Sequence, residues 1–64
     1  MMTEEGWRLL WKNQLLDIVL EMNLYPRTRE GVDEAQELVN TVHLVAMDRG
    51  MTPHQAAINL QIKH

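Results

Sequence analysis

The chain has 64 residues, of which 45% are hydrophobic and 23% charged, with three glycines, two prolines and no cysteine. This composition excludes a disordered or low-complexity chain, and without cysteine there is neither a disulfide framework nor a thiolate metal site. The net charge of −3 argues against a protein that coats nucleic acid or an anionic membrane surface. No apolar run reaches the roughly 18 residues of a spanning helix, and residues 1–5 lack the basic region of a signal peptide. We therefore expect one cytoplasmic domain over residues 1–64.

The first expected helix covers residues 3–23 and has two apolar faces where a surface helix has one. Thr3 is suited to cap its start, and Pro26 is expected to stop it. At about 100° per residue, one broad face consists of Trp7, Leu10, Trp11, Leu15, Ile18, Val19 and Met22. A second stripe on nearly the opposite face consists of Leu9, Leu16 and Leu20, with Arg8 and Lys12 at its rim. Trp7 and Trp11, one turn apart, are both expected in the core.

The second expected helix covers residues 29–49. Glu30, Asp33 and Glu34 crowd its beginning, where the helix dipole favours acids, and Gly50 is suited to the position after its end. Its apolar face consists of Val32, Ala35, Leu38, Val39, Val42, Val45 and Ala46, so the side chains there are small. Leu44 lies alone on the polar face. We expect the broad face of the first helix to pack against this small-residue face.

The third expected helix covers residues 52–63 and has the clearest start signal. Thr52 and Gln55 form the pattern of a capping box, with Pro53 at the first helical position. The spacing of Thr52, Ala56, Ala57, Leu60 and Ile62 resembles the first helix of many helix-turn-helix units. That resemblance implies DNA binding by residues 32–63. With the recognition helix placed on residues 52–63 itself, Gln55 and Asn59 would read base edges, and Lys63 would be the cation available for phosphate.

These segments predict an all-α fold, in which a long antiparallel helical hairpin is completed by a short C-terminal helix. A chain of this size buries only roughly 60% of the surface that its unfolded form exposes. Small domains usually gain the missing stability from disulfides, a metal or a partner chain. Because cysteine is absent and no metal-ligand pattern is present, we expect a dimer or a complex with another protein.

The second stripe of the first helix indicates a function, because its three leucines are expected to be buried against another apolar surface. The third helix of the same chain, a second copy, or another protein could provide it. For the second and third alternatives, the expected protein-binding residues are Leu9, Leu16, Leu20, Leu44, Arg8 and Lys12. Replacing Leu16 and Leu20 with Glu is then expected to abolish association and to leave helicity intact.

Catalysis is not expected. No histidine pair has the spacing of a helical metal site, His43 is placed at the boundary of the apolar face, and no phosphate-binding or nucleophile motif is present. We also expect too little room for a pocket of about 300 Å³, the lower bound for ligand sites. The sequence therefore predicts no cofactor, no metal and no small-molecule substrate.

The favoured function is a non-catalytic protein-interaction module that regulates or inhibits a partner by occupying its surface. Small size, an acidic balance and no catalytic set fit a phage or prophage accessory protein. The acids of the second helix, Glu30, Asp33, Glu34, Glu37 and Asp48, are expected to form a solvated face, or alternatively to compete for a basic groove on another protein. The alternative function is the small DNA-binding regulator described above.

Overall fold

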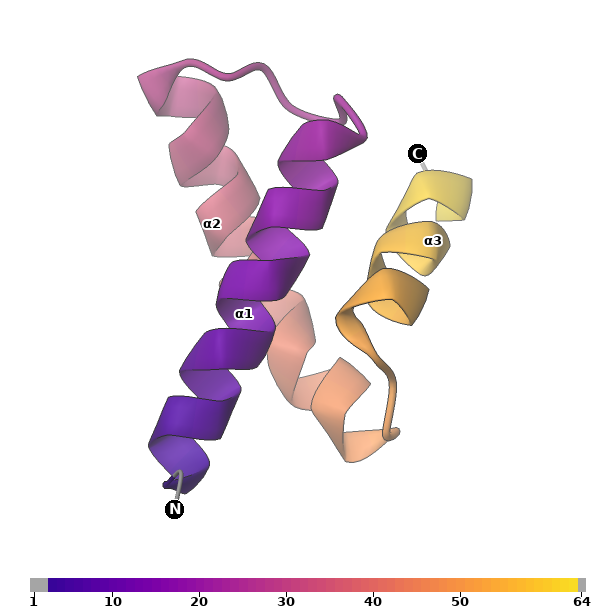
Figure 1. The fold of residues 1–64 in the computed structure, drawn as a ribbon. Coiled ribbons are helices and arrows are strands. Elements are labelled where there is room, and N and C mark those ends of the chain that lie inside the picture. The colour runs from indigo at the N-terminus through magenta and orange to yellow at the C-terminus, as the bar shows by residue number, and fades with distance from the viewer. Residues whose placement is uncertain (1–2, 64) are drawn as a thin grey trace.

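The computed structural model describes the backbone of residues 3–63 and the side chains of residues 3–60. Within this range the chain forms three helices and no strand: α1 (Glu4–Glu21), α2 (Arg29–Asp48) and α3 (Pro53–Lys63) (Figure 1). The all-α prediction is confirmed, and each boundary lies within two residues of the expected range. None of the helices in the described range is both long enough and apolar enough to cross a membrane.

Each helix begins at a threonine that caps it. The hydroxyl oxygen of Thr3 accepts a hydrogen bond from the Gly6 N–H at 3.1 Å, and that of Thr28 accepts one from the Gly31 N–H at 3.1 Å. At α3 the bonds are reciprocal: the Thr52 N–H donates to Gln55 Oε1 at 3.0 Å, and the Gln55 N–H donates to Thr52 Oγ1 at 3.2 Å. The capping box predicted from the sequence is confirmed.

The ends of α1 and α2 share one backbone motif, in which a residue with positive φ follows the helix. Gly50 has φ 69°, and the Met51 N–H donates to the Ala46 carbonyl at 2.9 Å. Asn23 has φ 58°, and the N–H of the following residue reaches back to Val19 in the same way. The expectation that Pro26 stops the first helix is therefore wrong. The helix has already ended at Glu21, because Asn23 turns the chain.

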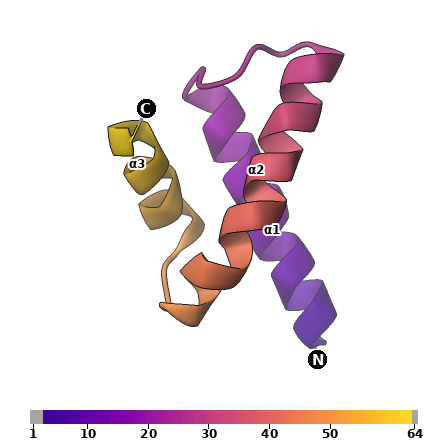
Figure 2. The same cartoon turned by 180° about the vertical axis from the view of Figure 1, so that it is seen from behind.

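Helix α1 lies between the other two helices. In both views α2 and α3 flank the C-terminal half of α1 on opposite sides, and α1 crosses α2 with the opposite chain direction (Figures 1 and 2). The buried core draws on all three helices: Trp11, Leu15, Val19, Ala35, Val39, Ala46, Ala56 and Ala57. Large side chains of α1 thus meet small ones of α2 and α3, as predicted for the first pair of helices.

The loop between α1 and α2 packs directly on Gly31. This residue is buried in the first turn of α2, and a Cβ there would collide with the Pro26 carbonyl oxygen and lie 2.7 Å from Pro26 Cγ. Glycine therefore stands in this helix because the preceding loop approaches too closely for any side chain.

Candidate interaction surface

The second leucine stripe of α1 does not form one uncovered surface. Leu16 and Leu20 are half-buried and pack against the core, whereas Leu9 remains 57% exposed. A helix between two neighbours is contacted on two sides, so it needs apolar residues beyond a single face. Leu16 and Leu20 are therefore covered in part within the chain, as the first of the three alternatives expects, and the role of the leucines in binding stays a prediction.

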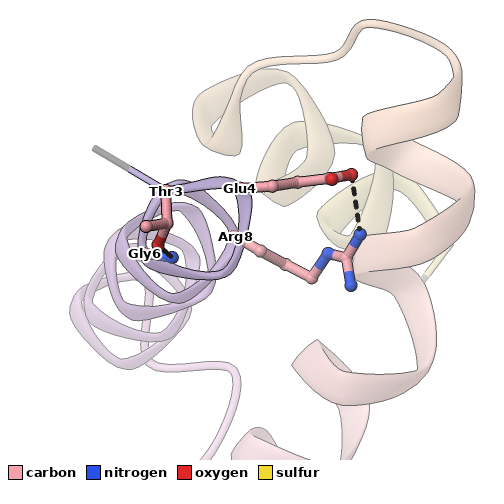
Figure 3. Close-up of polar contacts among 4 residues, drawn as sticks. All are labelled: Thr3, Glu4, Gly6 and Arg8. Carbon is pink, nitrogen blue, oxygen red and sulfur yellow. Dashed lines mark hydrogen bonds and ion pairs between the residues drawn. The ribbon is translucent and has the colours of Figure 1, made fainter. Parts of the chain in front are cut away.

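The other predicted binding residues, Arg8, Lys12 and Leu44, also lie in different environments. The guanidinium of Arg8 pairs with the Glu4 carboxylate one turn earlier, at 3.4 Å, close to the Thr3 cap (Figure 3). Lys12 is half-buried. Leu44 is 59% exposed on α2, as expected for an apolar residue on a polar face. Leu9 and Arg8 therefore lie on the N-terminal half of α1, and Leu44 lies on a different helix.

The two tryptophans have different environments, so the prediction that both belong to the core is wrong for Trp7. Trp11 is 5% exposed, and its indole N–H donates to the Met51 carbonyl at 3.1 Å. Trp7 is 55% exposed and Leu10 is 39% exposed. In both views the N-terminal end of α1 extends beyond its crossing with α2 and away from α3 (Figures 1 and 2). We define Trp7 and Leu10, which lie one turn apart on the same face, as the α1 surface, whereas Leu9 is exposed on nearly the opposite face of the helix.

A groove of about 310 Å³ adjoins this surface and is called the α1 groove. It lies between the first half of α1 and the turn that joins α2 to α3. Among the described residues its lining contains no charged side chain: Trp7, Leu10, Trp11, Gln14, Met47, Gly50, Met51, Thr52 and Pro53. An exposed tryptophan beside an uncharged groove is the arrangement that anchors many protein interfaces. The signal in the sequence was the Trp7–Trp11 pair, but the pair does not reveal which member the other helices cover.

A second groove of about 510 Å³ lies between α2 and α3 and is called the α2–α3 groove. It is lined by Thr41, Val42, Val45, Ala46, Arg49, Met51, Ala56, Asn59 and Leu60. The spacing predicts Val45 on the apolar face that packs against the first helix, but Val45 is 56% exposed. That assignment is wrong because α2 turns its C-terminal half past α1, so that part of its apolar face borders a groove.

The sizes of these grooves correct the expectation that the domain has no room for a 300 Å³ pocket. Within the described range neither lining includes a carboxylate or an imidazole, and no group of three His, Cys, Asp or Glu side chains could hold a metal ion. His43 is not at the boundary of the apolar face as expected. It is 8% exposed, with Nδ1 2.6 Å from the Asn40 carbonyl oxygen, and therefore donates to that oxygen.

The two residues predicted to read DNA bases, Gln55 and Asn59, contact nearby residues of the same chain. Gln55 Oε1 accepts the Thr52 N–H in the capping box, and Asn59 Nδ2 lies 3.9 Å from the Met51 sulfur. The side chains of Ile62 and Lys63 lie outside the described residues. The acids of α2, Glu30, Asp33, Glu34, Glu37 and Asp48, are all exposed. This distribution provides an acidic surface on α2, whereas the α1 groove is uncharged.

Comparison with known proteins gives no relative: the chain matches no protein-family model, no curated protein and no solved structure. The geometry of the α1 surface and of the two grooves is therefore the basis for a functional proposal.

Proposed function

We propose that this chain is a non-catalytic protein-interaction module that self-associates through the α1 surface and regulates a partner protein by occupying part of its surface. The observation that carries the proposal is Trp7, which is 55% exposed beside an uncharged groove. Tryptophan is concentrated at the energetic centres of interfaces, because it buries a large area at a small entropic cost. On this proposal Trp7 is the principal contact residue, and Leu10 extends the contact along the same face of α1.

Charge supports a second copy as one occupant of the α1 surface. Repulsion between two copies of a chain with a net charge of −3 is weakest where their contact avoids carboxylates. The lining of the α1 groove contains none, and the acids of α2 lie elsewhere. Pairs related by a two-fold axis are also the commonest oligomers, and they place the same surface of both chains in contact.

The molar mass in solution tests self-association, measured by light scattering over a tenfold range of protein concentration. We expect the mass to rise from 7.5 kDa towards twice that value. Trp7→Glu should keep the mass at 7.5 kDa at every concentration, because it places a charge at the contact. The matched control is Leu44→Glu, which changes a side chain of similar exposure, 59%, on another helix. A wild-type mass of 7.5 kDa throughout, or equal loss of the dimer in both variants, would reject self-association.

Photo-cross-linking tests the regulatory part of the proposal. A photoreactive amino acid at position 10, on the α1 surface, is expected to give a covalent adduct with a second protein in the native cell. The same group at position 33, on the acidic side of α2, is the control. Adducts that contain only this chain would show that the α1 surface serves self-association alone.

A further inference from the structure

We propose that the α2–α3 groove binds an amphipathic helix of a partner protein, one that presents an apolar face and an acidic side chain. This site is separate from the α1 surface, because the two linings share only Met51 and are formed by different helix faces. Figure 2 shows α2 and α3 from the side away from α1, diverging from their common turn.

The spacing of the lining residues fits a helix. On α2 the groove is lined at positions 41, 45 and 49 and at positions 42 and 46, which is one face over two turns. On α3 the lining positions 56 and 60 lie one turn apart. Ala46 and Ala56 are small, so the axis of another helix can approach to the usual 8–10 Å. A helix that lays its apolar face in such a groove is a recurrent mode of recognition.

The apolar face of α2 is more exposed at this groove than is usual for residues that form a core. Val45 belongs by spacing to the apolar face of α2, yet it is 56% exposed at the groove. Val42 and Leu60 are half-buried beside it. An apolar helix face would remove these side chains from water, and each buried methylene group contributes roughly 0.8 kcal/mol in such a transfer.

The charge of Arg49 indicates which kind of helix the groove binds. Arg49 is the one charged residue in the described lining, and no carboxylate of the described chain forms an ion pair with it. The guanidinium offers five N–H donors and no acceptor, so it favours a carboxylate on the occupant. A second copy of this acidic chain could in principle supply one, but it would also bring the net charge of −3 towards the acids of α2. A helix from a less acidic partner avoids that repulsion.

The test uses a displayed library of 14-residue amphipathic helical peptides, each with leucine on one face and Glu, Gln or Lys at one scanned position. The full chain is the bait. We expect Glu peptides to be enriched over the matched Gln and Lys peptides by about two- to fivefold, which is the range for a partly exposed ion pair. Arg49→Gln should remove that preference, whereas the control Arg27→Gln, in the loop before α2, should retain it.

Two neighbouring residues provide the matched control for position. Val45→Asp places a charge in the groove, and we expect it to reduce enrichment of all peptides by about tenfold or more. Leu44→Asp alters the adjacent residue, which is equally exposed at 59% but does not line the groove, and should leave enrichment unchanged. Circular dichroism checks that both variants remain helical.

Several results would overturn the proposal. They are no enrichment of any peptide, enrichment without a preference for Glu, or equal loss in the two Asp variants. Self-association, measured by light scattering, that persists in Trp7→Glu but is lost in Val45→Asp would assign the groove to a second copy and overturn the proposal. Repeating the selection with Trp7→Glu as bait separates this site from the proposed function, because the α1 surface is then disabled and capture by the groove should persist.

Discussion

Gly31 shows how one missing side chain positions a whole loop. The Pro26 carbonyl oxygen and ring occupy the space where a Cβ would stand. Ala is favoured over Gly inside a helix by about 1 kcal/mol, so propensity alone predicts that alanine stabilises α2. The collision opposes this gain. Because one of the atoms involved belongs to the backbone, it cannot move aside as a flexible side chain can.

For Gly31→Ala we expect a net loss of about 1–3 kcal/mol in the free energy of unfolding, the range typical of overpacking. Urea denaturation followed by circular dichroism measures it. Gln36→Ala, on the exposed side of the same helix, should change stability by less than about 0.5 kcal/mol. A Gly31→Ala protein as stable as the wild type would mean that the loop moves away from α2 at little cost.

The two tryptophans give a second test at the scale of the residue. Trp11→Phe removes the indole N–H and leaves the Met51 carbonyl without its donor in a partly buried site. We expect a loss of about 1–3 kcal/mol in the free energy of unfolding. Trp7→Phe keeps an aromatic ring at an exposed position and should cost less than about 0.5 kcal/mol in the monomer. Equal losses in the two variants would contradict the different environments of the two rings.

At the scale of the element, α1 is the helix on which the other two pack. Its apolar residues extend around more of its circumference than one neighbour could cover, and its C-terminal half has α2 on one side and α3 on the other (Figure 1). Leu16 and Leu20 are therefore part of the fold. The first two turns of α1 extend past both neighbours, so their apolar residues, Trp7, Leu9 and Leu10, remain exposed.

The packing of Leu16 and Leu20 changes the result expected for the double variant Leu16→Glu/Leu20→Glu. From the stripe alone the double variant should lose association and stay helical. From the packing it should lose its cooperative unfolding transition, because two charges would enter a half-buried apolar contact. Leu9→Glu is the control and should unfold as the wild type does, since Leu9 is 57% exposed. A folded double variant with normal thermal stability would show that Leu16 and Leu20 are dispensable to the core.

At the scale of the whole molecule, the core is small for three helices. Four of its eight buried apolar residues are alanines, which contribute little apolar area each. Small domains of this kind are marginal unless something else stabilises them. The α1 surface and the two grooves are the places where association could add burial.

If the chain self-associates, its thermal stability depends on its concentration, because unfolding then separates the copies. We expect the Tm to rise by about 3–5 °C for each tenfold increase in concentration. Calorimetry or circular dichroism at two concentrations measures this, with Trp7→Glu expected to show no dependence. A constant wild-type Tm would agree with a monomer and would count against the proposed dimer.

The sequence by itself determined the three helices and most of their boundaries. Capping residues, the positive-φ glycine and apolar spacing act within one or two turns of the chain, so they can be read locally, as the Thr52–Gln55 pair shows. Asn23 is a local signal of the same kind, because its positive φ turns the chain three residues before Pro26.

Only the tertiary structure decided which apolar residues are buried in the core and which stay exposed. Trp7 and Trp11 lie on the same side of one helix, and so do Val42 and Val45 on another, yet one of each pair is more deeply covered. The choice depends on where α1 and α2 cross and on where α3 turns away. These positions follow from contacts between residues far apart in the sequence, such as Trp11 with Met51, which periodicity within one helix does not contain.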